Sequence, residues 1–221
     1  MAKLKVAVLI SGRGSNLQAL IDACARPEFP AEIVLTISNR ADAPGLARAA
    51  AANIPAIVIE HGQGDEREAF EAALTEAIAA HEAELICLAG FMRLLTATFV
   101  ERWRNRLINI HPSLLPAFPG INVHARVLEA GVRFSGCTVH FVRAEMDDGP
   151  IIVQGAVPVL AEDDEDGLAA RVLAVEHRCY PLALRLIAEG RVRVAGLHVT
   201  IDDGGQRAPL PILNPPDDIV G

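Results

Sequence analysis

Short apolar runs alternate with amphipathic segments along the first half of the chain. Residues 5–10 and 33–38 are too short for a typical helix and are rich in Val, Leu and Ile, which is typical of buried parallel strands. Between them, Leu17, Leu20 and Cys24 recur at helical spacing. The same reasoning predicts strands at residues 56–59, 85–89 and 107–110 and helices at residues 43–52 and 65–81. This alternation predicts an α/β fold of the Rossmann-like kind, with a mostly parallel twisted sheet and helices on both faces.

The second half is expected to extend the sheet and to end in a long helix. A helix is predicted over residues 123–130, and residues 136–142 and 151–159 are β-rich. The helix over residues 165–188 should be interrupted and kinked at Pro181. We expect a hairpin over residues 191–202 and then a Pro-rich tail, so that residues 1–205 form a single domain and residues 206–221 the tail.

Composition narrows the class of protein. A chain of 221 residues suits one ordinary domain, and its 51% hydrophobic content excludes a disordered chain. The net charge of −8 argues against nucleic-acid binding. The cysteines are too scattered for a zinc site or a disulfide framework: Cys24, Cys87, Cys137 and Cys179. No signal peptide or membrane-spanning run is present, so we expect a cytoplasmic protein that binds neither a metal nor a membrane.

A glycine-rich loop, Ser11-Gly-Arg-Gly-Ser-Asn16, connects the first predicted strand to the first predicted helix. Gly12 and Gly14 permit close backbone approach, so that N–H groups and the helix dipole can bind a phosphate. Ser15 and Gln18 have the spacing of a capping box. A dinucleotide-binding loop requires another Gly where Leu17 stands, and the Gly-Lys of a Walker A loop is missing. The loop therefore favours a monophosphate, and a glycine turn without a ligand is the alternative.

Asn109 and His111 lie two residues apart near the end of a predicted strand, so their side chains point to the same side. Pro112 should end the strand. A His taken alone is most often a structural residue. An amide donor beside an imidazole, however, suits the oxyanion that develops during acyl transfer. The pair thus predicts an acyl-transfer site at the carboxyl end of a strand, where open α/β sheets bind ligands.

Three carboxylates are ambiguous from the pattern alone. Asp147 and Asp148 lie in a turn with Gly and Pro, where Asp most often serves turn formation. Glu176 falls on the apolar stripe of the last helix, between Val172 and Cys179. A buried carboxylate needs a cation or hydrogen-bond donors, so Glu176 is a ligand candidate. The alternative is a residue at the rim whose carboxylate reaches water.

These motifs resemble those of the phosphoribosylglycinamide formyltransferases over nearly the whole chain except the tail. The resemblance rests on Ser11-Gly-Arg-Gly-Ser-Asn16, Ala89-Gly-Phe-Met-Arg-Leu-Leu95, Asn109-Ile-His-Pro-Ser-Leu-Leu-Pro116, Val139-His-Phe-Val142 and Asp147-Asp-Gly-Pro150. The Asn, His and Asp set is common to formyl transferases with several substrates, and the Gly-Ser-Asn loop is similar to that of the purine enzymes. The resemblance implies the formyltransferase fold for residues 1–205.

The resemblance also implies roles for individual residues. The implied catalytic residues are Asn109, His111 and Asp147. The implied ribonucleotide site is formed by Gly14, Ser15, Asn16 and Glu176. The implied folate contacts are Arg67, Met92, Arg93, Leu94, Leu95, Asn109, Arg143, Ala144, Glu145, Met146 and Asp147. The chain departs from relatives at Asp148, where they often carry Gly, and at Ala117, where some carry a basic residue.

The implied reaction is formyl transfer from 10-formyltetrahydrofolate to the amine of glycinamide ribonucleotide in de novo purine synthesis, without a metal. Asn109 would donate to the oxyanion, and His111, kept protonated by Asp147, would add positive charge. The expected partners are these two small molecules, and the protein should be a monomer or a homodimer. One alternative is another amine acceptor, either an amino sugar or methionyl-tRNA. A second is a catalytically silent module that senses folate or nucleotide.

Overall fold

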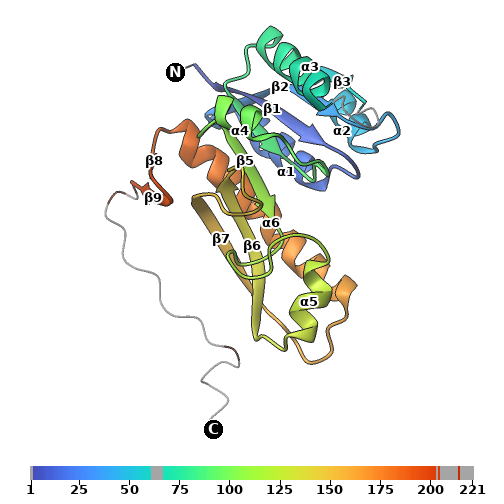
Figure 1. Cartoon of the computed structure of the whole chain (residues 1–221), viewed down its shortest axis with the longest axis vertical. Helices are drawn as coiled ribbons and strands as arrows, with labels where there is room; N and C mark the ends of the chain where they lie inside the picture. The colour runs from blue at the N-terminus through green and yellow to red at the C-terminus, as the bar shows by residue number, and fades with distance from the viewer. Residues whose placement is uncertain (1, 61–66, 203, 205–213, 215–221) are drawn as a thin grey trace.

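One mixed sheet organises the molecule. The computed structural model describes residues 2–60, 67–202, 204 and 214. Seven strands pair in the order β3-β2-β1-β4-β5-β6-β7 (Figure 1). Their bounds are β1 Leu4–Ile10, β2 Ala31–Ser38, β3 Ala56–Val58, β4 Leu85–Leu88, β5 Leu107–His111, β6 Phe134–Phe141 and β7 Ile151–Pro158. The pairs among β1 to β5 are parallel, whereas β6 and β7 join in antiparallel orientation, which confirms the predicted, mostly parallel α/β sheet.

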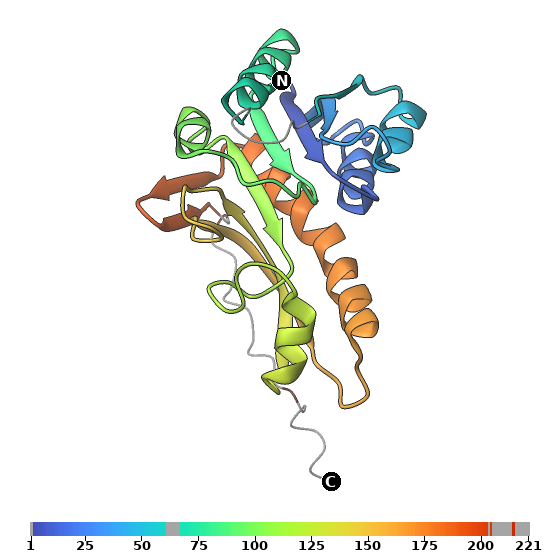
Figure 2. The same ribbon diagram turned by 45° about the vertical axis from the view of Figure 1, so that its right-hand side comes forward.

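Helices cover both faces of this sheet, as predicted. The described helices are α1 Ser15–Cys24, α2 Gly45–Ala51, α3 Arg67–Ala80, α4 Ala97–Arg102, α5 Val123–Glu129 and α6 Glu165–Ala188. Leu17 of α1 belongs to an apolar cluster on one face, and Leu74 of α3 belongs to a second cluster. Val8 and Leu9 of β1 enter the first and the second cluster respectively, because side chains alternate along a strand. Figure 2 shows the long helix α6 running alongside the strands.

The end of the chain agrees with the prediction where the structure describes it. The predicted hairpin is confirmed as β8 Val192–Ala195 and β9 His198–Ile201, which pair antiparallel in a separate sheet. The helix predicted over residues 65–81 is described from Arg67 onward, and its predicted first residues lie outside the described part. Residues 206–221 also lie outside it, apart from Asn214. The domain boundary at residue 205 therefore stays a prediction.

The predicted interruption at Pro181 is wrong, because α6 is one continuous helix. Proline lacks an N–H and clashes with the preceding turn, at a cost of about 3 kcal/mol. Tyr180 and Leu184, on either side of Pro181, are completely buried. Burying two such side chains contributes on the order of 3–6 kcal/mol, which offsets the cost of the proline.

The parallel strands bring three loops to one edge of the sheet. Because β1, β4 and β5 are neighbours and run parallel, the segments that follow their carboxyl ends meet there. Tyr180 of α6 fixes the helix below this edge, since its hydroxyl lies 2.9 Å from the carbonyl oxygen of Leu88 and 3.3 Å from that of Ile108. The glycine loop, the segment after β4 and the end of β5 therefore line one site.

Candidate functional site

The imidazole of His111 lies between two hydrogen-bond acceptors at the end of β5. Its Nδ1 is 3.4 Å from Oδ2 of Asp147, and its Nε2 is 3.0 Å from the carbonyl oxygen of Phe118. A carboxylate and a carbonyl oxygen only accept hydrogen bonds, so each ring nitrogen of His111 faces an acceptor. The side chain is only 7% exposed.

Asp147 reaches His111 from the turn between β6 and β7. Its φ of 56° is left-handed, a conformation that Asp and Asn adopt more readily than most residues. Its Oδ2 also accepts a hydrogen bond from the N–H of Gly120 at 2.8 Å. Relatives often carry Gly at the position of Asp148. The positive φ, which would favour glycine, is found at Asp147 and not at Asp148, so the backbone conformation at Asp148 does not require glycine. Ala117, the other departure, is exposed, and its carbonyl oxygen accepts a hydrogen bond within its own loop.

His140 joins this cluster, although the sequence analysis did not single it out. It lies opposite Asn109 in the antiparallel register of β5 and β6, with its Nε2 3.4 Å from Nδ2 of Asn109. Its Nδ1 is 3.1 Å from the carbonyl oxygen of Phe141, so Nδ1 carries the hydrogen and Nε2 accepts. Burial lowers the pKa of His140 and so favours the neutral ring. The Phe141 carbonyl and the charge of Asp147 raise this pKa, but their effects are smaller. His140 lies in the motif Val139-His-Phe-Val142, which was assigned no role, and the strand register places it beside Asn109.

The glycine loop leads directly into α1, as predicted. Gly14 precedes the helix with a φ of 70°, a conformation that favours glycine. The predicted capping box is wrong, because Ser15 is the first residue of α1 and no described side chain caps this helix end. Gln18 instead donates from Nε2 to Oδ1 of Asp22 at 2.8 Å. The N–H groups at the start of α1 are therefore available to an anionic ligand.

A cavity of about 410 Å³ lies between the glycine loop and the segment after β4. It is lined by Ser11, Gly12, Arg13, Gly14, Ser15, Asn16, Asn39, Arg40, Ala89, Gly90, Met92 and Arg93. The backbone N–H of Met92 donates to Oγ of Ser11 at 2.8 Å and ties the two segments together. The cavity thus joins the predicted phosphate loop to two of the predicted folate residues.

Glu176 is buried, and its partner is an amide rather than a cation. Nδ2 of Asn16 donates to Oε2 of Glu176 at 2.7 Å. Burial raises the pKa of Glu176, while the hydrogen bond from Asn16 and the charge of His111 act in the opposite direction. Oδ1 of Asn16 is buried without a hydrogen-bond partner among the described residues. The pair therefore offers acceptor atoms to a ligand, and the burial of Glu176 argues against the alternative of a residue at the rim.

Three of the predicted folate residues, here called the apolar rim, have large apolar side chains that are exposed. The side chains of Met92, Leu94 and Met146 are 74%, 63% and 56% exposed. The same two loops also hold the predicted contacts Arg93, Leu95, Arg143, Ala144, Glu145 and Asp147.

Two other predicted folate contacts have different surroundings. Arg143 is 8% exposed, and its guanidinium donates to Oδ1 of Asn105 at 2.6 Å and to the carbonyl oxygen of Val142 at 2.9 Å. The structure therefore directs this side chain into the fold rather than to the rim. Arg67 is the first described residue of α3, and its side chain is exposed. Its contact with folate stays a prediction.

Within residues 2–60, 67–202, 204 and 214, no three His, Cys, Asp or Glu side chains form a group that could hold a metal ion. None of the helices in this part of the chain is long and apolar enough to cross a membrane.

Comparison with known proteins identifies similar chains. Residues 4–184 match the family described as formyl transferase. A phosphoribosylglycinamide formyltransferase from Escherichia coli (strain K12) is 44% identical, over 93% of this chain and 96% of its own length. The crystal structure of glycinamide ribonucleotide transformylase 1 from Symbiobacterium toebii has a TM-score of 0.88 and 49% identity, covering 91% of this chain and 95% of that chain.

A longer relative contains a similar segment. The trifunctional purine biosynthetic protein adenosine-3 of Gallus gallus is 53% identical over 87% of this chain. This chain spans only 19% of that protein's length.

Proposed function

This chain belongs to the formyl transferase family, and we propose that it is a phosphoribosylglycinamide formyltransferase of purine biosynthesis. It transfers the formyl group of 10-formyltetrahydrofolate to the amine of glycinamide ribonucleotide. The observation that carries the proposal is the cluster of Asn109, His111 and Asp147 at the edge where the glycine loop also ends. The likeness to the Escherichia coli enzyme over nearly its whole length supports this choice of substrates.

Asn109 serves as the donor to the oxyanion. When the substrate amine attacks the formyl carbon, the formyl oxygen gains negative charge. One N–H of the Asn109 amide is directed to His140, and the other can donate to this oxygen. A donor that is already oriented stabilises the developing charge without reorganising during the reaction.

His111 and Asp147 provide charge and move the proton. The His111 imidazolium lies beside Asn109 on the same strand and adds positive charge near the oxyanion. The step forms a bond from the amine nitrogen to the formyl carbon and breaks the bond from that carbon to N10 of the folate. One proton must pass from the amine to N10, and Asp147, acting through a water molecule, helps to transfer it.

The ribonucleotide binds across the 410 Å³ cavity. Its phosphate accepts hydrogen bonds from the N–H groups of Gly14, Ser15 and Asn16, at the positive end of the α1 dipole. Glu176 and Oδ1 of Asn16 accept hydrogen bonds from polar hydrogens elsewhere on the substrate. This arrangement directs the amine toward His111.

The folate co-substrate binds against the apolar rim. Met92, Leu94 and Met146 cover its flat ring system, since burying these exposed side chains is favourable. Backbone groups of the same loops, which include Arg93, Leu95, Ala144 and Glu145, orient the ring. Asn109 and Asp147 then meet the formyl group, and Arg67 contacts the glutamate tail.

The test is a formyl-transfer assay with the purified full chain and 10-formyltetrahydrofolate. Glycinamide ribonucleotide, an amino-sugar nucleotide and methionyl-tRNA are offered as separate acceptors, and formylated products are identified by mass spectrometry. We expect the ribonucleotide alone to be formylated. Formylation of another acceptor instead would overturn the substrate assignment. Binding of both ligands without turnover would indicate a sensing module, and release of formate without an acceptor would indicate a hydrolase.

A further inference from the structure

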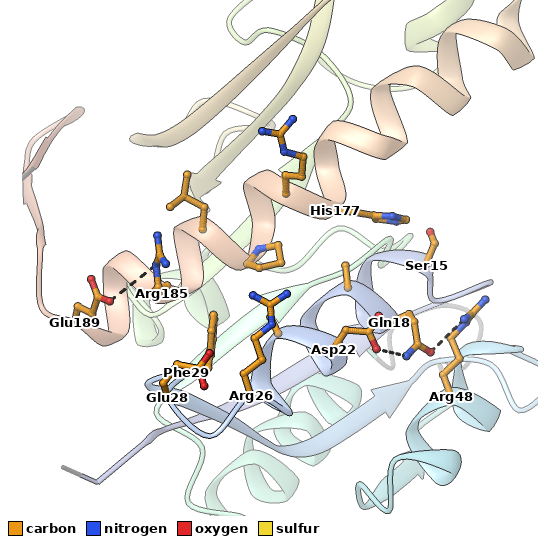
Figure 3. A pocket seen from close by; sticks show the side chains of 15 residues that line it. Ser15, Gln18, Asp22, Arg26, Glu28, Phe29, Arg48, His177, Arg185 and Glu189 are labelled. Carbon is orange, nitrogen blue, oxygen red and sulfur yellow. Dashed lines mark hydrogen bonds and ion pairs between the residues drawn. The ribbon is translucent and has the colours of Figure 1, made fainter. Parts of the chain in front are cut away.

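Arg48 is a half-buried residue of α2 whose guanidinium reaches the glycine loop. A cavity of about 680 Å³ between α1 and α6 shares only Ser15 with the smaller cavity described above. Figure 3 shows Arg48 and Gln18 at one end of this larger cavity. Nε of Arg48 donates to the carbonyl oxygen of Arg13 at 2.9 Å, and Nη1 donates to Oε1 of Gln18 at 3.2 Å. One side chain therefore joins the loop to the first turn of α1.

Helix α2 holds two successive carbonyl groups of the loop. The N–H of Gly45 donates to the carbonyl oxygen of Gly12 at 3.0 Å, and Arg48 binds the next carbonyl, that of Arg13. In a trans peptide the N–H points away from the C=O of the same unit. The N–H groups of Arg13 and Gly14 therefore point away from α2. Among the described residues, no acceptor binds either of them.

The loop also lies directly against the backbone of α2. A Cβ added to Gly14 would lie 2.7 Å from Cα of Gly45, and one added to Gly45 would lie 3.2 Å from Cα of Gly14. Such close packing leaves little space for the loop to shift toward α2. Arg48 opposes the shift away from α2, because it holds the Arg13 carbonyl.

We propose that Arg48 is a positioning residue for the phosphate of the ribonucleotide. It orients the Arg13 and Gly14 peptide groups through the Arg13 carbonyl, and it fixes the start of α1 through Gln18. The ribonucleotide then finds N–H donors already arranged, and binding does not have to order the loop. This inference rests on the ribonucleotide site of the proposed function.

The test combines direct binding with kinetics. Calorimetric titration of glycinamide ribonucleotide and of ribose 5-phosphate into Arg48→Ala should give about tenfold weaker binding, the scale expected when a charge-assisted hydrogen bond is lost. The kcat and the KM for folate should stay unchanged. Ribose 5-phosphate reports on the loop without catalysis, so loss of its binding would support the proposal even if formyl transfer itself were not found.

Arg26→Ala is the matched control. Arg26 lines the same cavity at a distance from the loop and is exposed (Figure 3), so the variant loses the same charge without touching the Arg13 carbonyl. The affinity of Arg26→Ala for glycinamide ribonucleotide and for ribose 5-phosphate should equal that of the unmodified protein. An equal loss in Arg26→Ala would overturn the proposal in favour of a general effect of positive charge.

Arg48→Lys separates charge from position. Lys keeps the charge but not the planar fork that binds two acceptors at once. A positioning role predicts that Arg48→Lys recovers only part of the affinity and that the loss persists in about 1 M salt, where charges are screened within about 3 Å. Full recovery by Lys, or disappearance of the loss in salt, would overturn the proposal. So would an equal fall in kcat and in affinity for both substrates.

Discussion

His140 accepts a hydrogen bond from the amide nitrogen of Asn109 across the antiparallel strands β5 and β6. The acceptor is Nε2, because the hydrogen of the neutral ring is on Nδ1, facing the carbonyl oxygen of Phe141. An acceptor at this place turns the NH2 group of Asn109, and not its oxygen, toward His140. The amide therefore presents its second N–H to the site.

We expect His140→Phe to lower kcat by about tenfold, the scale of one lost hydrogen bond. The ring volume is kept while the acceptor is removed, so the Asn109 amide can rotate and the oxyanion loses part of its donor. KM values for both substrates should change little. His140→Gln offers an oxygen acceptor and should retain more activity than His140→Phe. Wild-type kcat in His140→Phe would show that Asn109 is oriented by other contacts.

Asn109→Ala and His111→Ala should each lower turnover by roughly two to three orders of magnitude, the scale for removing an oxyanion donor or an acid–base group. Melting temperature should confirm that both variants fold. His198→Ala, an exposed histidine on β9, is the control and should keep full activity. Near-normal turnover in either purified site variant would remove that residue from the mechanism.

Gly14→Val should block ribonucleotide binding far more than folate binding. A Cβ at Gly14 lies 2.7 Å from Cα of Gly45 and the φ of 70° is unfavourable for Val, so the loop must move. Gly190→Val is the control. Its φ of 68° imposes the same backbone strain as at Gly14, but no described atom lies within 4 Å of the added Cβ. It should lose stability but retain ribonucleotide affinity. If titration shows equal loss of both ligands in Gly14→Val, the loop has a structural role only.

Glu176→Gln should weaken ribonucleotide binding by about 1.5 to 3 kcal/mol, the range for a hydrogen bond to a charged group. Folate affinity should hardly change. Gln keeps the volume and an oxygen that can accept from Asn16, so stability without ligand should stay level or rise. Titration and urea unfolding on the same variant test both statements. Lost stability with unchanged affinity would withdraw Glu176 from the site.

The stability gain of Glu176→Gln should depend on pH. Because burial raises the pKa of Glu176 above its usual 4.5, the folded state keeps this proton to higher pH than the unfolded state does. Ionisation therefore costs stability as the pH rises from about 4.5 through the raised pKa, and the cost is complete above it. The advantage of the variant should grow across that window and then stay constant.

The sequence by itself determined the features that depend on neighbouring residues. Apolar runs and helical spacing predicted the α/β elements, because each period reflects the local geometry of strand or helix. The Asn109 and His111 pair followed from strand alternation, and the glycine loop from its position between strand and helix. The resemblance to the formyl transferases added Asp147 from a turn that the pattern alone left ambiguous.

Only the tertiary structure decided which distant residues meet. His140 faces Asn109 because of the register of β5 and β6, and Glu176 binds Asn16 across 160 residues of chain. The tertiary structure also contradicted two predictions made from local sequence. Gly14 and not Ser15 precedes α1, and α6 continues through Pro181. Strand register, helix docking and burial depend on contacts between segments far apart in the chain, and the free energy of packing them exceeds the local preference of a single residue.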